Sequence, residues 1–109
     1  ALEAAPAAVP AVDVYAVNSG GGAEIAAFTA LETLRSALPG LRIVQHTGGG
    51  SFRSQLKKAD KSGARWALIW GDDEVANATV TVKSLREQAE QVALPLAELA
   101  GFLQRGTAS

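Results

Sequence analysis

The sequence contains no cysteine, a single histidine and no long apolar run. Without cysteine the chain has neither a disulfide framework nor a thiolate zinc site. A lone imidazole gives little support to a metal site or to a histidine-centred triad. The longest apolar runs fall far short of the roughly 20 residues that cross a bilayer, and the alanine-rich start lacks the basic segment of a signal peptide. These absences predict a cytoplasmic protein.

What the sequence does contain is an uneven distribution of charge within a chain of ordinary composition. It has 109 residues, 48% of them hydrophobic, which is enough for one domain with a core that needs no disulfide or metal. The formal net charge is −1. Residues 51–65 nevertheless carry five of the ten basic side chains and only one acid, Asp60. A nucleic-acid coat over the whole surface is therefore excluded, but a local basic face is predicted.

Hydrophobic periodicity predicts alternating strands and helices. The order is strand 12–17, helix 23–38, strand 41–45, helix 52–61 and strand 66–70, followed by a short helical turn at 72–76. Two further strands are expected at 78–83 and 90–94, and a closing helix begins with Pro95 in its first turn. Strand–helix alternation favours parallel strands joined by right-handed crossovers. The fold class predicted is α/β, a three-layer sandwich on a mixed five-stranded sheet with three main helices.

Two apolar patterns predict which side chains form the core. The first helix carries a stripe at spacings of three and four, formed by Phe28, Leu31, Leu34 and Leu38. On the third strand Trp66 and Trp70 share one side, because successive side chains alternate across a strand. Core packing is the expected role of both indoles, and stacking on an unpaired base would require one ring at an exposed end of the sheet.

Several smaller signals have structural explanations beside functional ones. The glycine loops 20–22 and 48–50 each lie between a strand and a helix, where backbone amides could hold a phosphate. Neither loop fits a phosphate-loop or dinucleotide pattern, so turn-forming glycine is the favoured interpretation. His46 is expected to be an exposed loop histidine.

The acidic turn and the basic helix also have two interpretations each. Asp72, Asp73 and Glu74 could serve acid–base chemistry, accept hydrogen bonds from base amino groups, or simply complement a helix dipole. The basic face of helix 52–61 could follow a phosphate backbone or could be a solvated surface. Composition and spacing thus predict an α/β domain with one basic face, and no function.

The segment 55–83, QLKKADKSGARWALIWGDDEVANATVTVK, closely resembles the C-terminal anticodon-binding domain of the bacterial histidyl-tRNA synthetases, which belong to class IIa. The family pattern combines a GG-x-S loop, a helix ending in ADKSGA and a G-E-D-E-x-AN-G-TVTVK turn and strand. These motifs match Gly49, Gly50 and Ser51 with their neighbours, residues 55–64 and residues 71–83. Two departures are Asp72, where the family usually has Glu, and Ala78, which replaces a common Gly.

The resemblance implies a non-catalytic module that recognises the anticodon stem-loop of histidine tRNA. Residues 1–11 would then be a linker from a separate N-terminal catalytic domain, residues 12–104 the anticodon-binding domain, and residues 105–109 a frayed C-terminus. The resemblance further implies a homodimeric parent histidine–tRNA ligase that uses ATP and magnesium, with no membrane or DNA partner.

The same resemblance, combined with the charge pattern, assigns the candidate RNA-binding residues. Phosphates would be neutralised by the basic helix residues Arg53, Lys57, Lys58 and Lys61. Splayed anticodon bases would meet polar side chains of the acidic turn and the following strand, namely Asp72, Asp73, Glu74, Asn77 and Lys83. Replacing Glu74 is expected to reduce discrimination between anticodons. Two alternatives remain: a synthetase-like paralogue domain that serves assembly or regulation, and a small-ligand-binding α/β domain.

Overall fold

A computed structural model describes residues 12–46, 49–86 and 91–108, and shows strands and helices in the predicted alternation. The strands are β1 (Val14–Asn18), β2 (Ile43–Gln45), β3 (Trp66–Trp70), β4 (Thr79–Ser84) and β5 (Val92–Pro95). The helices are α1 (Gly22–Ala37), α2 (Phe52–Lys61), α3 (Asp72–Asn77) and α4 (Leu96–Ala108). The predicted linker 1–11 lies outside the described residues, as do parts of the loops before α2 and β5.

The five strands form one mixed sheet in the order β2-β1-β3-β4-β5. β1 pairs in parallel with both β2 and β3, whereas β4 pairs antiparallel with β3 and β5. Both edge strands are short, three residues in β2 and four in β5. The predicted mixed five-stranded sheet is confirmed.

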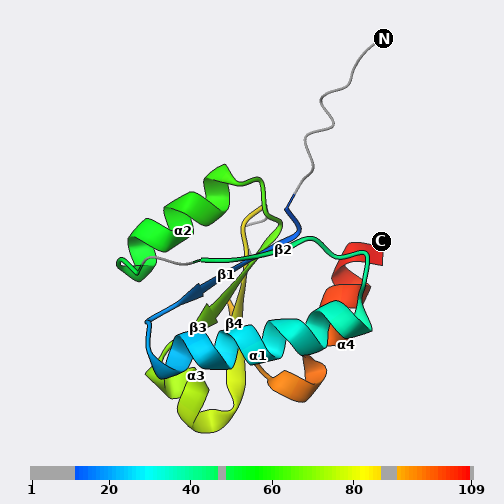
Figure 1. The fold of residues 1–109 in the computed structure, drawn as a ribbon. Helices are drawn as coiled ribbons and strands as arrows, with labels where there is room; N and C mark the ends of the chain where they lie inside the picture. Colours follow the sequence, from blue (N-terminus) through cyan, green and yellow to red (C-terminus); the bar gives the residue numbers. More distant parts are fainter. Residues whose placement is uncertain (1–11, 47–48, 87–90, 109) are drawn as a thin grey trace.

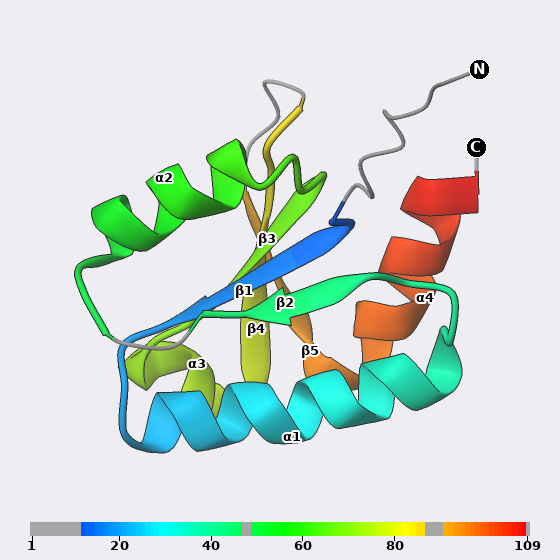
Figure 2. The same ribbon diagram turned by 45° about the horizontal axis from the view of Figure 1, so that its top comes forward.

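The helices cover the two faces of the sheet unequally. α1 and α4 lie on one face and α2 on the other, which gives the predicted three layers (Figures 1 and 2). The short α3 joins β3 to β4 at the end of the sheet, where the sequence predicts a helical turn. Within the described chain, every helix is too short or too polar to span a membrane.

The main hydrophobic core lies between the sheet and the α1/α4 layer. Both tryptophans of β3 face this side, as predicted, together with Leu68. The largest fully buried side chains of this core are Trp70, Leu31, Leu34, Leu68, Leu103, Val14, Val80 and Val82. A smaller buried cluster lies under α2 and consists of Tyr15, Val17, Ala59 and Ala64.

The buried side of α1 differs from the prediction at Phe28, whose side chain is 55% exposed. The stripe that faces the sheet consists of Ala23, Ala27, Leu31 and Leu34. Phe28 is rotated by about 100° from Ala27 around the helix, which turns it away from this stripe. Because Ala23 and Ala27 are small, α1 can lie close to the sheet without a large side chain between them.

Three element ends also differ from the prediction. Pro95 is the last residue of β5, opposite Thr79, rather than the first turn of α4. α4 extends to Ala108, into the segment 105–109 that is predicted to be frayed. Ala78 is not part of β4: it terminates α3 in the left-handed conformation with φ 55°, a position at which the family commonly has glycine.

Candidate nucleic-acid interface

Helix α2 directs its basic side chains away from the sheet. Ser51 caps the helix, since its hydroxyl accepts a hydrogen bond from the Ser54 N–H at 3.1 Å. Gln55 and Ala59 are fully buried against β1, so the residues on the opposite side of the helix face solvent. The exposed residues include all four predicted phosphate contacts, Arg53, Lys57, Lys58 and Lys61.

The Gln55 side chain attaches α2 to the end of β1. Its Oε1 accepts the Asn18 N–H at 2.9 Å, and its Nε2 donates to the carbonyls of Asn18 at 2.8 Å and Gly50 at 2.9 Å. Gln55 is 0% exposed, so these bonds satisfy groups that water cannot reach. Sequence reasoning missed this role, because the bond partners are 37 residues apart in the chain.

The same amide argues against a nucleotide site at the glycine loops. In sheets of this kind, ligands enter the crevice beyond the carboxyl ends of the parallel strands. Here Gln55, Asn18 and the Gly50 carbonyl lie at that position and bond to each other. Among the described residues there is also no group of three or more His, Asp or Glu side chains that could hold a metal ion. The residues present therefore do not fit ATP or magnesium.

On the α2 side, helices cover the β1 half of the sheet and one end of β4. α2 packs on β1, with Ile69 of β3 in the cluster beneath it, and α3 contacts β4, where Glu74 accepts the hydroxyl of the buried Thr81. Because Val80 and Val82 face the main core, Thr79, Thr81 and Lys83 face the α2 side, where Thr81 is buried and Thr79 and Lys83 are half-buried. We call the outer face of α2 together with this side of β4 and β5 the α2–β4 surface.

An ion pair shows which flank of α2 borders β4. Arg86, two residues after β4, donates from Nη2 to Asp60 Oδ1 at 2.9 Å. Arg53 precedes Asp60 by seven residues, almost two helical turns, and so lies on the same flank. Lys57 lies on the neighbouring, outward-facing side. Lys58, two residues before Asp60, is rotated from it by about 200° and lies on the opposite flank. All four predicted phosphate contacts are thus exposed on α2, with Arg53 on the flank that borders β4.

Helix α3 exposes most of the predicted base contacts at one end of this surface. Asp72, Asp73 and Asn77 are all exposed, and Asn77 Nδ2 donates to the Asp73 carbonyl at 3.0 Å. The acids occupy the first turn, where they also complement the helix dipole. The two interpretations of these carboxylates are compatible, since an exposed acid in a first turn remains available to a ligand.

Glu74 behaves differently, because both of its carboxylate oxygens already accept hydrogen bonds. Oε1 accepts the Gly71 N–H at 2.9 Å, and Oε2 accepts the Thr81 hydroxyl at 2.7 Å. Burial acts to raise the pKa of Glu74, but these hydrogen bonds outweigh it, and the pKa lies below its ordinary value. Glu74 therefore fixes α3 to β4 and is the least available of the predicted base contacts.

Lys83 lies apart from the α3 residues. It is half-buried on β4 opposite Ala67, near the start of β3, whereas Thr79 adjoins the end of α3. Four residues of strand separate the two positions, a distance of about 14 Å at the usual rise of a strand. The predicted base contacts therefore form two groups at the two ends of the α2–β4 surface.

His46 is buried, which corrects the prediction of an exposed loop histidine. It is 5% exposed; its Nε2 lies 2.7 Å from the Gly49 carbonyl and its Nδ1 lies 2.9 Å from the Tyr15 hydroxyl. Since a carbonyl only accepts, Nε2 carries the proton in this bond, and in the neutral ring the Tyr15 hydroxyl donates to Nδ1. Burial also raises the pKa of Tyr15. The histidine holds the loop that leads into α2 against β1.

The tryptophans are core residues and not a stacking platform. Trp70 is 1% exposed, and Trp66 makes an edge-on contact with Phe102 at a centroid distance of 5.4 Å. The indole N–H groups of both are buried and have no hydrogen-bond partner among the described residues. Neither ring is therefore available to an unpaired base, as the core-packing interpretation predicts.

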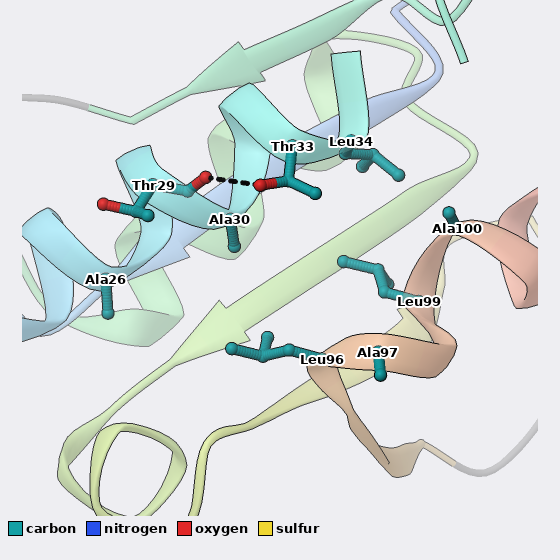
Figure 3. A pocket seen from close by; sticks show the side chains of 9 residues that line it. All are labelled: Ala26, Thr29, Ala30, Thr33, Leu34, Leu96, Ala97, Leu99 and Ala100. Atoms are coloured by element: carbon teal, nitrogen blue, oxygen red, sulfur yellow. Dashed lines mark hydrogen bonds between the residues drawn. The ribbon is translucent and has the colours of Figure 1, made fainter. Parts of the chain in front are cut away.

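The opposite layer carries an apolar groove between α1 and α4 (Figure 3). Its volume is about 480 Å³, and all nine side chains that line it are alanine, threonine or leucine. Thr33 donates its hydroxyl to the Thr29 carbonyl, so one of the two lining hydroxyls is already engaged. With no charged side chain in its walls, the groove does not suit a phosphate backbone.

Comparison with known proteins identifies relatives of this chain. The family model described as "Anticodon binding domain" matches residues 12–106. Among curated proteins, the chain is 51% identical over 92 residues to the histidine–tRNA ligase of Nitrosomonas eutropha, an alignment that covers 84% of this chain and 21% of that protein. The chain thus spans about a fifth of the length of that relative.

Solved structures give the same fold. The histidyl-tRNA synthetase of Nostoc sp. PCC 7120 matches with a TM-score of 0.79 and 30% identity, covering 88% of this chain and 22% of that one. The apo histidyl-tRNA synthetase of S. aureus matches with a TM-score of 0.73 and 26% identity, covering 85% and 23%. The RNA binding domain of threonyl-tRNA synthetase from Cryptosporidium parvum Iowa II has a TM-score of 0.78, 13% identity and coverage of 85% and 23%, so this match shows the fold alone.

Proposed function

The chain belongs to the anticodon-binding domain family, and from this membership we propose that it holds the anticodon arm of histidine tRNA for a histidine–tRNA ligase. The α2–β4 surface is the part of the chain that receives the RNA. The observation that carries this proposal is the exposure of all four α2 cations on the outer side of a helix whose Gln55 and Ala59 are buried against the sheet. Such an exposed basic helix suits contact with a phosphate backbone.

The proposed mechanism has two parts. Arg53, Lys57, Lys58 and Lys61 neutralise phosphates of the anticodon arm, which gives affinity that falls as salt rises. Asp72, Asp73 and Asn77 at one end of the surface, and Lys83 at the other, meet base edges and give selectivity. Glu74 contributes by holding α3 against β4, because both of its oxygens are engaged within the domain.

We assign the ligation chemistry to other parts of a longer protein. The chain spans about a fifth of its histidine–tRNA ligase relatives, and its crevice and acidic groups fit neither ATP nor magnesium. The proposed parent is a cytoplasmic homodimer that binds ATP and magnesium elsewhere and has no DNA or membrane partner. The small-ligand alternative is disfavoured, because Gln55 fills the crevice at which such a ligand would bind.

The test is a salt titration of binding to a histidine anticodon stem-loop and to one with a changed anticodon. We expect preference for the cognate loop, and we expect Lys57→Ala and Lys61→Ala each to reduce the salt slope by about one. Arg105→Ala is the matched control, since this exposed cation belongs to α4 on the opposite layer. Absence of binding at low salt would contradict the proposal and favour the paralogue interpretation.

A further inference from the structure

Arg86 connects the end of β4 to the end of α2. Its Nε donates to the Ala64 carbonyl at 3.0 Å, and its Nη2 donates to the Asp60 carbonyl at 3.1 Å and to Asp60 Oδ1 at 2.9 Å. The adjacent Leu85 N–H donates to the Arg65 carbonyl at 2.9 Å, which keeps this segment beside the loop that leads from α2 into β3. One guanidinium therefore bonds to the carboxylate and to two backbone carbonyls around the end of α2.

Asp60 is the only acidic residue of α2, and it lies on the flank that borders β4. An unpaired carboxylate there would repel phosphates on the α2–β4 surface. It would also attract Lys57 of the same helix, three residues before it. None of the ion pairs among the residues that the structure describes joins Asp60 to a lysine, and its partner is Arg86.

We propose that Arg86 is a positioning residue for RNA binding, which neutralises Asp60 and thereby leaves the α2 lysines free to contact phosphates. This inference rests on the proposed function of the α2–β4 surface. The chemistry suits arginine, because its planar fork can reach a carboxylate and two carbonyls at once, whereas lysine offers one point charge. The role is indirect: Arg86 acts on the RNA through Asp60.

A direct role would have a different signature. The Arg86 side chain is 45% exposed, so a phosphate could also approach it from solvent. A direct phosphate contact adds its own counterion release, which does not depend on whether position 60 carries a charge. A purely structural role, in which Arg86 only satisfies carbonyls at the end of α2, would be equally independent of the charge at position 60. Removal of the Asp60 charge therefore separates the proposal from both.

The experiment is a double-mutant cycle on stem-loop affinity with wild type, Arg86→Gln, Asp60→Asn and the double variant. At low salt we expect Arg86→Gln to weaken binding about two- to fivefold, the size of an exposed charge pair. Asp60→Asn is expected to tighten binding by up to about twofold, and the double variant should match Asp60→Asn. Urea unfolding of each variant confirms that the compared proteins are folded.

An equal loss on Arg86→Gln in both backgrounds would overturn the inference. If that loss came with a salt slope lower by about one, Arg86 would be a direct phosphate contact. If the salt slope of binding were unchanged, Arg86 would have a purely structural role. Failure of the wild-type chain to bind at low salt would contradict the proposed function instead. An additive cycle with intact wild-type binding would contradict only the role of Arg86.

Discussion

The two faces of the sheet are built from different interactions. The α1/α4 face buries the large apolar side chains, with Trp70, Leu68 and Leu31 essentially inaccessible to solvent. The α2 face has a small buried cluster, and its helix is joined to the rest by polar bonds from Gln55 and Arg86. Apolar burial supplies most of the stability of a domain. The α1/α4 face therefore stabilises the fold, whereas the α2 face presents charged side chains. The following predictions test this division, in order of decreasing effect.

The largest effect is expected in the apolar layer. Leu31→Ala removes a fully buried side chain from α1 and should destabilise the domain by about 2–5 kcal/mol. Phe28→Ala on the same helix is the matched control; because Phe28 is 55% exposed, its loss should change stability by no more than about 0.5 kcal/mol. Urea midpoints of both variants measure the difference. Equal losses would mean that the core does not follow the stripe described for α1.

A smaller effect is expected where a polar bond holds the α2 layer. Gln55→Met keeps the side-chain volume but removes three hydrogen bonds, leaving the Asn18 N–H and carbonyl unpaired in the interior. A loss of about 1–3 kcal/mol is expected from such orphaned groups, measured by urea unfolding. Ser54→Ala, one residue earlier and exposed, serves as the control. If Gln55→Met were neutral, the α2 layer would be held by apolar contacts after all.

Ala78→Gly is expected to stabilise the domain by about 1 kcal/mol, since an L-residue with φ 55° is strained and glycine is not. Thermal unfolding measures the change, with Ala76→Gly inside α3 as the control that should destabilise by a similar amount. The strained residue joins α3 to β4. A gain in stability would therefore show that the strain at Ala78 lowers the stability of the domain. A loss of stability at Ala78→Gly would show that the left-handed cap does not form.

The smallest effect concerns pH. The folded pKa of Glu74 lies below its ordinary value of 4.5, so its stabilising contribution is complete above that pH and is lost as pH falls through the folded pKa. The difference in unfolding free energy between wild type and Glu74→Gln should therefore shrink on acidification. Thr81→Val removes a bond that lowers this pKa, so the pH-dependent part of the difference should be smaller and the decline should end at a higher pH. A difference that is constant with pH would mean that Glu74 is not held by these bonds.

The sequence predicts the regular parts of the molecule well, because local periodicity determines them. Strand β3, with apolar residues on both faces, and the basic spacing of α2 are read directly from the chain. The errors arise where burial depends on distant partners. His46 is in a loop, yet it is buried because Tyr15, 31 residues earlier, supplies a hydroxyl. Phe28 is apolar, but it lies outside the stripe of Ala23, Ala27, Leu31 and Leu34 with which α1 faces the sheet.

In the candidate site, too, the features set by local sequence were predicted, and those set by distant partners were missed. Residue type and spacing identified the exposed cations of α2, since exposure of charge on an amphipathic helix is a local property. Neither Gln55, which anchors the helix, nor Arg86, which pairs with its single acid, carries a local signal. Glu74 has the residue type of a base contact, and only the tertiary bond to Thr81 shows that it is engaged.

The short edge strands have a consequence for how the domain behaves when crowded. β2 offers three residues and β5 four, and the last residue of β5 is a proline without an N–H group. A second sheet that tried to continue this one would find few free donors and acceptors along either border. Edge-to-edge self-association is thus disfavoured by the short edge strands and by the proline at the end of β5. A domain with such short edge strands can therefore be part of a larger protein without its sheet pairing with strands of other molecules.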